Sequence, residues 1–380
     1  MRQRALRTWY SLRNFFENEA GTTLPADRIS YSEEQITIFP RTKPTNIGLG
    51  MLALLGAERL GTLNEVETDA KLAHMLESLR KADRYEGFFY DWYDSLSVQK
   101  LSQWPTDGHD LDQFLSSVDN AWLALALLIV SKAKPLLAES IRENFLDAMD
   151  FEFFFDKELE EVWGGYSVSK KEYVNYHYPR NLVSEPRIVH WVNAALCFDK
   201  DRKIEILRRL LDKEGQVPSQ PAGGSLFELY MPRLFVKEKH LSRVFDQIFA
   251  QHQSYGEANL GGLVGLSVVD DPNNENRYTE MGCGGAYPST SVLSAHGAAL
   301  AFMANPEIAY RSLTEMEKIS GFFDEHGYAE AVDVKTGKVA KETQVFINQV
   351  MTMLSLMCDD EYFPELFAKF FDGEDEAALL

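Results

Sequence analysis

The ten residues from Ala121 to Val130 are apolar on every side of a helix, and this segment constrains the fold most strongly. Such a helix must be buried all round, because it has no polar face to turn toward water. Other segments carry apolar residues on one face alone, as in residues 4–20, 135–149 and a helix that ends near Lys81. This alternation predicts a ring of helix pairs with the apolar helices inside.

The number and length of the helical segments favour an all-α fold, an (α/α)6 toroid. Further helices are expected at residues 47–60, 185–197, 204–211, from 227 onward, 289–303, 306–319 and 343–357. A solenoid of helical repeats is the alternative, but the sequence has no fixed period. No linker rich in Pro, Gly or Ser divides the chain, so we expect one domain over residues 1–380, with an acidic C-terminal end from about residue 359.

Long aromatic or glycine-rich stretches interrupt the helical pattern. They lie at residues 151–183, 218–225 and 254–288, and a hairpin-like element is expected at 327–340. Loops of this length inside a compact domain are usually functional. We therefore expect long aromatic loops and a few short strands at one mouth of the toroid.

The charge of the chain excludes several classes of partner. The formal net charge of −20 argues against nucleic acid and anionic membrane surfaces, which both need a basic face. No run of about 18 apolar residues is present to span a membrane. No signal peptide is visible, so a cytoplasmic location is expected, or a periplasmic one if the chain has been shortened. The three cysteines have no ligand spacing, so neither a metal nor a cofactor is expected, and the oligomeric state stays open.

Residues 84–95 combine aromatic side chains with two acids, Asp91 and Asp94. Aromatic rings cover the apolar faces of a pyranose, while carboxylates accept hydrogen bonds from its hydroxyls and can transfer protons. The pattern is typical of a loop that binds sugar. The alternative is that these aromatic residues belong to the core.

Asp119 stands at the entry to the wholly apolar helix. The positive end of a helix dipole stabilises an ionised carboxylate, so we expect Asp119 to carry a negative charge. The alternative is an ordinary N-cap, because aspartate is common at that position.

Six ordered motifs resemble those of the glycoamylase-like family, which includes bacterial endo-β-1,2-glucanases and the transglycosylation domain of cyclic β-1,2-glucan synthases. Residues 41–49 (RTKPTNIGL) are similar to RTSPTNIGL, 87–95 (GFFYDWYDS) to GHFYNWYDT, and 116–120 (SSVDN) to SSVDSGN. Residues 182–187 (LVSEPR) resemble LASEAR, 227–232 (FELYMP) resemble FEYLMP, and 328–333 (YAEAVD) resemble YGFYDAVN. The resemblance implies an (α/α)6 barrel that acts on a glucan.

Hydrolysis of a glycosidic bond needs one protonated and one ionised carboxyl group. Glu185 is the predicted proton donor, because it matches the glutamate of LASEAR and follows an aromatic loop that would raise its pKa. The alternative is an ion pair with Arg187 at a helix start. Asp94 and Asp119 are the candidates for the ionised partner, and both match family positions.

The resemblance and the aromatic loops also predict residues that contact the sugar. These are Arg41, Thr45, Asn46, Asp91, Trp92, Tyr93, Tyr176, Arg187, Phe227, Glu228, Glu257 and Tyr287. Three positions depart from the family. Asn348 stands where the family has the aspartate of an IDQG segment, Asp91 stands where it often has asparagine, and Phe88 stands where it has histidine. An amide cannot act as a base or a nucleophile, so Asn348 puts the usual activity in doubt.

We therefore weigh four functions. The first is a glycoside hydrolase that acts on a β-linked glucan, with β-1,2-glucan or its oligosaccharides as the expected substrate. A transglycosylase on the same substrate and a glycan-binding relative without activity are the alternatives. A sugar epimerase is weaker, because such enzymes use histidine bases and no histidine falls in a matched motif.

Overall fold

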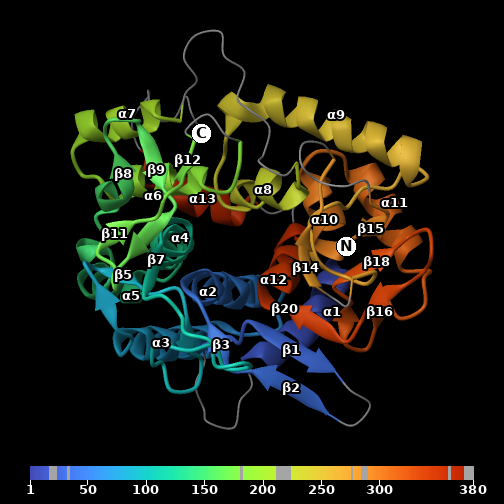
Figure 1. Cartoon of the computed structure of the whole chain (residues 1–380), viewed down its shortest axis with the longest axis horizontal. Coiled ribbons are helices and arrows are strands. Elements are labelled where there is room, and N and C mark those ends of the chain that lie inside the picture. The colour runs from blue at the N-terminus through green and yellow to red at the C-terminus, as the bar shows by residue number, and fades with distance from the viewer. Residues whose placement is uncertain are drawn as a thin grey trace.

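The computed structural model describes residues 1–16, 24–31, 35–179, 183–210, 224–274, 277–283, 290–357 and 361–371. Helices dominate these ranges and the strands are short (Figure 1), so the all-α prediction is confirmed. The acidic C-terminal end predicted from about residue 359 lies largely outside the described residues.

Six helices are buried along almost their whole length. They are α2 (Pro44–Arg59), α4 (Ser117–Ala133), α6 (Arg187–Leu196), α8 (Leu226–Tyr230), α10 (Ala295–Leu300) and α12 (Phe346–Ser355). The segment that is apolar on every side is the body of α4, where each residue from Ala121 to Val130 is at most 2% exposed. The prediction of an interior helix is therefore confirmed.

Six further helices are amphipathic or partly exposed. They are α1 (Arg2–Leu12), α3 (Glu65–Arg80), α5 (Pro135–Asn144), α7 (Lys200–Arg208), α9 (Ser242–Asn259) and α11 (Pro306–Met316). Five of them pack on one buried helix each: α3 on α2, α5 on α4, α7 on α6, α11 on α10, and α1 on α12. The ring of Tyr230 in α8 packs against Phe245 and Phe249 of α9.

The buried helices contact one another in a closed order. Helix α2 contacts α4, α4 contacts α6, α8 contacts α10, α10 contacts α12, and α12 returns to α2. Arg187 of α6 joins α8 by donating hydrogen bonds to the carbonyl oxygens of Glu228 and Leu229 at 2.9 and 2.8 Å. This cyclic order is the one that the predicted toroid requires. A short helix, α13 (Tyr362–Ala368), packs on α4 near the end of the described chain.

Small residues bring the buried helices close together. A Cβ added at Gly48 of α2 would lie 2.9 Å from Leu123 Cα and 2.9 Å from Trp122 O of α4. Only glycine allows this distance between the two backbones. Helices α2 and α4 therefore pack backbone against backbone at this point.

The strands form small antiparallel groups. The first five are β1 (Arg28–Tyr31), β2 (Ile36–Phe39), β3 (Arg41–Thr42), β4 (Arg84–Tyr85) and β5 (Phe88–Phe89). The next five are β6 (Tyr93–Asp94), β7 (Phe114–Ser116), β8 (Phe155–Asp156), β9 (Glu161–Trp163) and β10 (Gly165–Ser167). Then follow β11 (Glu172–Tyr173), β12 (His177–Tyr178), β13 (Val268–Asp271), β14 (Arg277–Glu280) and β15 (Val292–Leu293). The last are β16 (Phe323–Asp324), β17 (Gly327–Tyr328), β18 (Ala331–Asp333), β19 (Val339–Ala340) and β20 (Thr343–Val345).

Several strands lead directly into the buried helices. Strand β3 precedes α2, β7 precedes α4, β15 precedes α10 and β20 precedes α12. Pairing also joins distant parts of the chain, because Arg28 of β1 lies opposite both Phe39 of β2 and Val345 of β20. These strands therefore lie at the N-terminal ends of buried helices. This position agrees with the prediction of short strands at one mouth of the toroid.

Some predicted boundaries are wrong. The helix expected from residue 343 begins at Phe346, because Thr343–Val345 pairs with β1 as a strand. Residues 254–259 belong to α9 instead of an irregular insertion. The first helix ends as an α-helix at Leu12 and continues only as a short 3₁₀ turn. Strand pairing and helix length depend on partners far along the chain, which local periodicity does not record.

Within the described part of the chain, no helix combines the length and the apolar character needed to cross a bilayer.

Candidate active site

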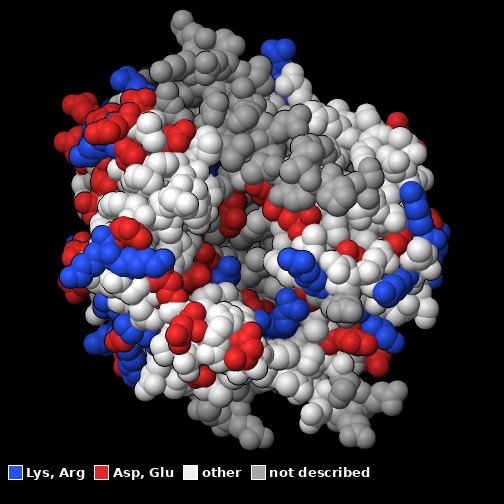
Figure 2. All heavy atoms as spheres, in the orientation of Figure 1, with Lys and Arg blue, Asp and Glu red and all other residues white. Residues whose placement is uncertain are grey.

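The face of the molecule in Figure 2 is hollowed near its middle, and acidic and basic side chains gather in and around the hollow. In the same orientation, Figure 1 draws α2, α4 and α12 near the middle of the molecule. Residues near the beginnings of α2, α4 and α6, together with Asp27 before β1 and Asp91 after β5, form one cluster of interacting charges. We call Asp27, Lys43, Asp91, Asp119 and Glu185 the hollow cluster.

Glu185 lies two residues before α6 and is partly exposed. Trp122 of α4 donates a hydrogen bond from Nε1 to its Oε1 at 2.5 Å. Burial, together with the negative charge of Asp119, raises the pKa of Glu185 to about 8. A carboxyl group with this pKa is protonated at neutral pH and can donate its proton.

Asp119 lies in the first turn of α4, while Ser116 is the N-cap and accepts a hydrogen bond from the Asp119 amide at 3.1 Å. Asp119 Oδ1 accepts a hydrogen bond from Thr45 Oγ1 at 2.6 Å and lies 3.2 Å from Lys43 Nζ. Burial alone would raise the pKa of Asp119, but the Lys43 charge and the hydrogen bonds from Ser116 and Thr45 lower it. The ionised state expected for Asp119 is thus supported by these contacts.

Asp91 follows β5 and faces the same charges. Burial and the negative charge of Asp119 raise the pKa of Asp91 to about 7, although Lys43 opposes the shift. Asp91 and Glu185 thus keep their protons to an unusually high pH because they are buried and because Asp119 nearby is ionised. Two acids of raised pKa beside one of lowered pKa are typical of acid–base chemistry.

Arg41 and Asn46 hold Asp27 at the edge of the cluster. Arg41 Nε lies 3.3 Å from Asp27 Oδ2, and Asn46 Nδ2 donates to Asp27 Oδ1 at 3.1 Å. The Arg41 guanidinium also lies 4.3 Å from the centre of the Trp104 ring and 5.8 Å from that of Trp92. These two partly exposed tryptophans meet edge to face at 5.1 Å, which leaves indole surface beside the cluster for a sugar.

The structure gives Asp94 a different environment from Asp119. Asp94 Oδ1 accepts hydrogen bonds from the amides of Leu96 and Ser97 at 3.0 and 2.7 Å, and from Ser97 Oγ at 2.9 Å. These bonds fix the turn after β6. The carboxylate of Asp94 therefore binds backbone amides of its own turn, and it is not part of the hollow cluster.

Arg187 pairs with Glu238 instead of Glu185. Its Nε and Nη2 atoms lie 2.8 and 3.0 Å from the two carboxylate oxygens of Glu238, and both side chains are at most 3% exposed. Arg187 also donates to the carbonyl oxygen of Ser184 at 2.9 Å, which fixes the backbone beside Glu185. Arg187 thus orders the loop that carries Glu185 and is too buried to contact a sugar.

Glu228 lies next to Glu185. Ser184 Oγ donates to Glu228 Oε1 at 2.5 Å, and the charge of Glu228 adds to the raised pKa of Glu185. Tyr178 of β12 is another neighbour of Glu185. Burial raises the pKa of its phenol, and the charge of Glu185 adds to this shift.

The other predicted contact residues are spread over the molecule. Tyr93 is core: it is fully buried and donates to the carbonyl oxygen of Asp83 at 2.5 Å. Tyr176 is 45% exposed, and Phe227 is partly buried in α8. Glu257 is exposed on α9, away from the beginnings of the buried helices. Tyr287 lies outside the described residues.

The aromatic stretch is mostly core, as its alternative interpretation held. Phe88 and Phe89 are fully buried, and Phe88 packs against Phe151 and Phe154. Trp92 is the member that stays partly exposed beside the charged cluster. The sequence pattern alone could not separate these roles, because burial depends on loops more than 50 residues away.

Asn348 is part of a second buried polar cluster at the start of α12. Its Nδ2 donates to Glu330 Oε2 at 2.6 Å, and Val345 N donates to Glu330 Oε1 at 2.6 Å. Burial and the negative charge of Asp270 raise the pKa of Glu330 to about 7. Arg28 holds Asp270 through two hydrogen bonds of 2.6 and 3.1 Å.

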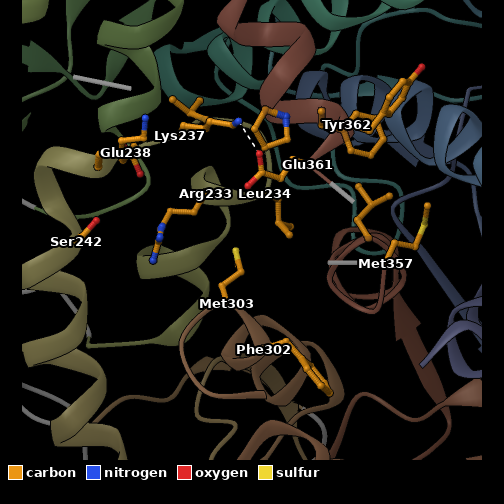
Figure 3. A pocket seen from close by; sticks show the side chains of 15 residues that line it. Arg233, Leu234, Lys237, Glu238, Ser242, Phe302, Met303, Met357, Glu361 and Tyr362 are labelled. Carbon is orange, nitrogen blue, oxygen red and sulfur yellow. Dashed lines mark hydrogen bonds and ion pairs between the residues drawn. The ribbon is translucent and has the colours of Figure 1, made fainter. Parts of the chain in front are cut away.

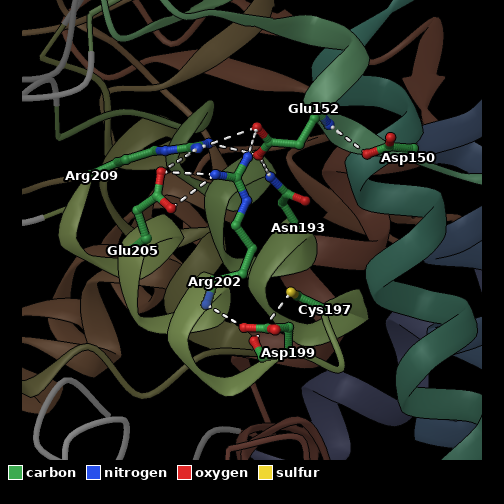
Figure 4. A network of polar contacts seen from close by, with 8 residues as sticks. All are labelled: Asp150, Glu152, Asn193, Cys197, Asp199, Arg202, Glu205 and Arg209. Atoms are coloured by element: carbon green, nitrogen blue, oxygen red, sulfur yellow. Dashed lines mark hydrogen bonds and ion pairs between the residues drawn. The ribbon is translucent and has the colours of Figure 1, made fainter.

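Two cavities lie away from the hollow cluster. One of about 400 Å³ is lined by the ends of α10 and α12, by Arg233 and by Glu238, as Figure 3 shows. Another of about 610 Å³ lies between α4, α5, α6 and α7 and borders the polar network of Figure 4. Neither is lined by a residue of the hollow cluster, nor is a third cavity of about 420 Å³ beside Arg202 and Arg209.

Asp27 and Lys43 are the two members of the hollow cluster that the sequence analysis missed, and Lys43 is the one cation among the five. A lysine in a polar motif is usually solvated, so it gave no reason to single it out. One signal was present, because Lys43 stands where the RTSPTN signature has serine.

Comparison with known proteins places the fold among β-1,2-glucan enzymes. No family model matches the chain. Over 212 residues the chain is 24% identical to the cyclic β-(1,2)-glucan synthase NdvB of Rhizobium meliloti (strain 1021). That match covers 55% of this chain but only 7% of the much longer relative.

Two solved structures share nearly the whole fold. The endo-β-1,2-glucanase from Chitinophaga pinensis, in complex with sophorotriose and glucose, matches with a TM-score of 0.73 and 15% identity. The match covers 99% of this chain and 96% of that one. A mutant endo-β-1,2-glucanase from Talaromyces funiculosus, in complex with β-1,2-glucan, matches with a TM-score of 0.72, 12% identity and coverage of 100% and 90%. The chain therefore has the fold of the endo-β-1,2-glucanases, and the glycoamylase-like family suggested by its motifs fits both kinds of match.

Proposed function

We propose that the protein is a glycoside hydrolase that acts on β-1,2-glucan or its oligosaccharides. The observation that carries this proposal is the pairing of Glu185, whose pKa is raised to about 8, with Asp119, whose pKa is lowered by Lys43. Glycosidic bond cleavage needs one carboxyl group in each state. The fold shared with the endo-β-1,2-glucanases supports the choice of substrate.

In this reaction Glu185 donates its proton to the glycosidic oxygen as the bond to the anomeric carbon breaks. Trp122 holds the Glu185 carboxyl group, and burial keeps it protonated until the sugar arrives. The ionised carboxylate of Asp119 stabilises the positive charge that develops on the sugar ring. Retaining and inverting mechanisms both use such an ionised group.

Release of reducing ends from purified β-1,2-glucan tests this proposal, with β-1,3- and β-1,4-glucans as controls. We expect turnover on the β-1,2-linked substrate and at most weak turnover on the others. Binding of β-1,2-glucan without any new reducing ends would contradict a hydrolase. If the lengths of the glucans are unchanged as well, that outcome would favour the glycan-binding alternative, for which the amide of Asn348 in place of a family aspartate is the reason.

A transglycosylase is the second candidate, because the curated relative is a cyclic β-(1,2)-glucan synthase. Such an enzyme passes the glucan to a sugar hydroxyl instead of water, so the number of reducing ends does not rise. Analysis of the products by mass spectrometry separates the two. Cyclic or lengthened glucans at constant reducing ends indicate transfer, and shorter linear oligosaccharides indicate hydrolysis.

A further inference from the structure

We propose that Lys43 is a positioning residue of the candidate site, whose ammonium holds Asp119 in its ionised state and sets the pH range of activity. This inference rests on the proposed function, and the experiment below keeps the two separable. Nothing in the predicted set of catalytic and sugar-binding residues includes Lys43.

The position of Lys43 is fixed by local structure. Lys43 is the extended N-cap residue of α2, directly before Pro44. Its Nζ lies 3.2 Å from Asp119 Oδ1, the same oxygen that accepts the hydrogen bond from Thr45. The ammonium also lies 5.8 Å from the centre of the Trp92 ring. The side chain is 25% exposed, so most of it is packed against the protein.

Charged groups from several elements face this ammonium. Burial alone would lower the pKa of Lys43, but the surrounding carboxylates raise it, so the side chain is a cation at neutral pH. The titratable and charged neighbours are Asp119 of α4, Asp91 after β5, Asp27 before β1, Glu185 before α6, Tyr278 of β14, and Arg41 of β3 through Asp27.

The balance of charge leaves Lys43 as the counterion of three acids. Arg41 and Asn46 already hold Asp27, so Asp91, Asp119 and Glu185 share the charge of Lys43. The contact at 3.2 Å gives Asp119 the largest part. Asp119 therefore ionises first, and its negative charge then helps to keep the protons on the other two acids.

Two sequence features fit this account. Lys43 stands where the RTSPTN signature has serine, and Asp91 stands where the family often has asparagine. One change adds a positive charge and the other adds an acid, and the structure brings both into the same hollow. We infer that the two residues compensate each other.

The test compares Lys43→Met, which keeps the apolar stem, with Lys43→Arg, which keeps the charge. Without the cation, the pKa values of Asp119 and Glu185 both rise, so both limbs of the pH profile of kcat/KM move to higher pH. A rise of one unit at the acidic limb lowers kcat/KM about tenfold there. We expect this loss on the acidic limb, at about pH 4 and below, no loss or a gain at pH 8, and a near-parental profile for Lys43→Arg.

A readout without turnover makes the result independent of the proposed function. The depressed pKa of Asp119 stabilises the fold above its unfolded pKa, and this gain is lost as pH falls. Lys43→Met should therefore lower Tm at pH 7.5 and lower it less at about pH 3, below the unfolded pKa of an aspartate. Lys318→Met, at an exposed lysine of a surface pair, is the matched control and should change Tm little at either pH.

Replacement of Asp91 by Asn in the Lys43→Met background should restore part of the lost Tm at pH 7.5, because it removes one of the unbalanced acids. The proposal is overturned if Lys43→Met lowers Tm equally at both pH values, or if its pH profile keeps the parental limbs. Absence of turnover in the parent would refute the proposed hydrolase, while the Tm series would still decide the role of Lys43.

Discussion

The hollow cluster and the polar network around Glu152 show what the ratio of acids to cations does to a buried carboxyl group. Glu152 accepts hydrogen bonds from Asn193 at 2.6 Å, from Arg209 at 2.8 and 3.2 Å, and from Arg202 at 2.5 Å (Figure 4). Burial would raise its pKa, but these partners lower it. In the hollow cluster, Lys43 is the counterion of three acids, and the pKa of Glu185 is raised to about 8.

The comparison separates structure from chemistry. Carboxylates that are matched by cations, such as Glu152 and Glu238, stay ionised and join elements that are distant in sequence. An acid left in excess retains a proton that it can give to a substrate. Three substitutions test this difference through the free energy of unfolding.

The largest loss of stability is expected for Arg187→Met. This change leaves Glu238 buried without its partner, and breaking a buried ion pair from one side costs about 3–5 kcal/mol. Urea unfolding measures the loss. The double variant Arg187→Met/Glu238→Gln should lose less, since it buries no uncompensated charge; an equal or larger loss in the double variant would argue against the pairing.

A smaller loss is expected for Glu152→Gln, about 1–3 kcal/mol at pH 7, because hydrogen bonds to a charged group are weakened. The lowered pKa means that Glu152 stabilises the fold above its unfolded pKa and ceases to do so as pH falls through the folded value. The difference from the parent should therefore shrink below about pH 4. Turnover should be unchanged, and a drop in kcat would show that the network has a role in the site.

A change in stability of opposite sign is expected for Glu185→Gln. Between the unfolded pKa and about pH 8, folding requires Glu185 to take up a proton, which costs stability as pH rises. Glutamine removes this cost. The variant should be at least as stable as the parent at pH 5 and gain on it toward pH 8; a loss like that of Glu152→Gln would mean that Glu185 is an ordinary structural acid.

Much of the fold could be predicted because its signals are local. The apolar body of α4 and the alternation with amphipathic helices follow from periodicity within each segment, and the capping box of Asn64 and Glu67 at the start of α3 is likewise a local signal. Strand β20 could not be predicted, because its partner β1 lies more than 300 residues away.

The site was only partly predictable for the same reason. Glu185 and Asp119 stand in recognisable motifs, and the structure brings them into one charged cluster. The turn that occupies Asp94, the partner of Arg187 and the charge balance of Lys43 depend on residues brought together by folding. Motif spacing shows which residue types are present, but it does not show which charged side chains will pair in the folded protein.

The most direct test of the central claim is the turnover of Glu185→Gln, with Glu139→Gln on the exposed face of α5 as the matched control. Glutamine keeps the size of the side chain but cannot donate a proton to the glycosidic oxygen. We expect kcat on β-1,2-glucan to fall by at least about two orders of magnitude, the usual contribution of general acid catalysis, with glucan binding retained.

A glycoside with an activated aryl or fluoride leaving group, which needs no protonation, should lose far less activity in the same variant. The parent should also lose activity above about pH 8, where Glu185 gives up its proton. Parental turnover of β-1,2-glucan by Glu185→Gln would contradict the account, because it would show that the proton of Glu185 is not used.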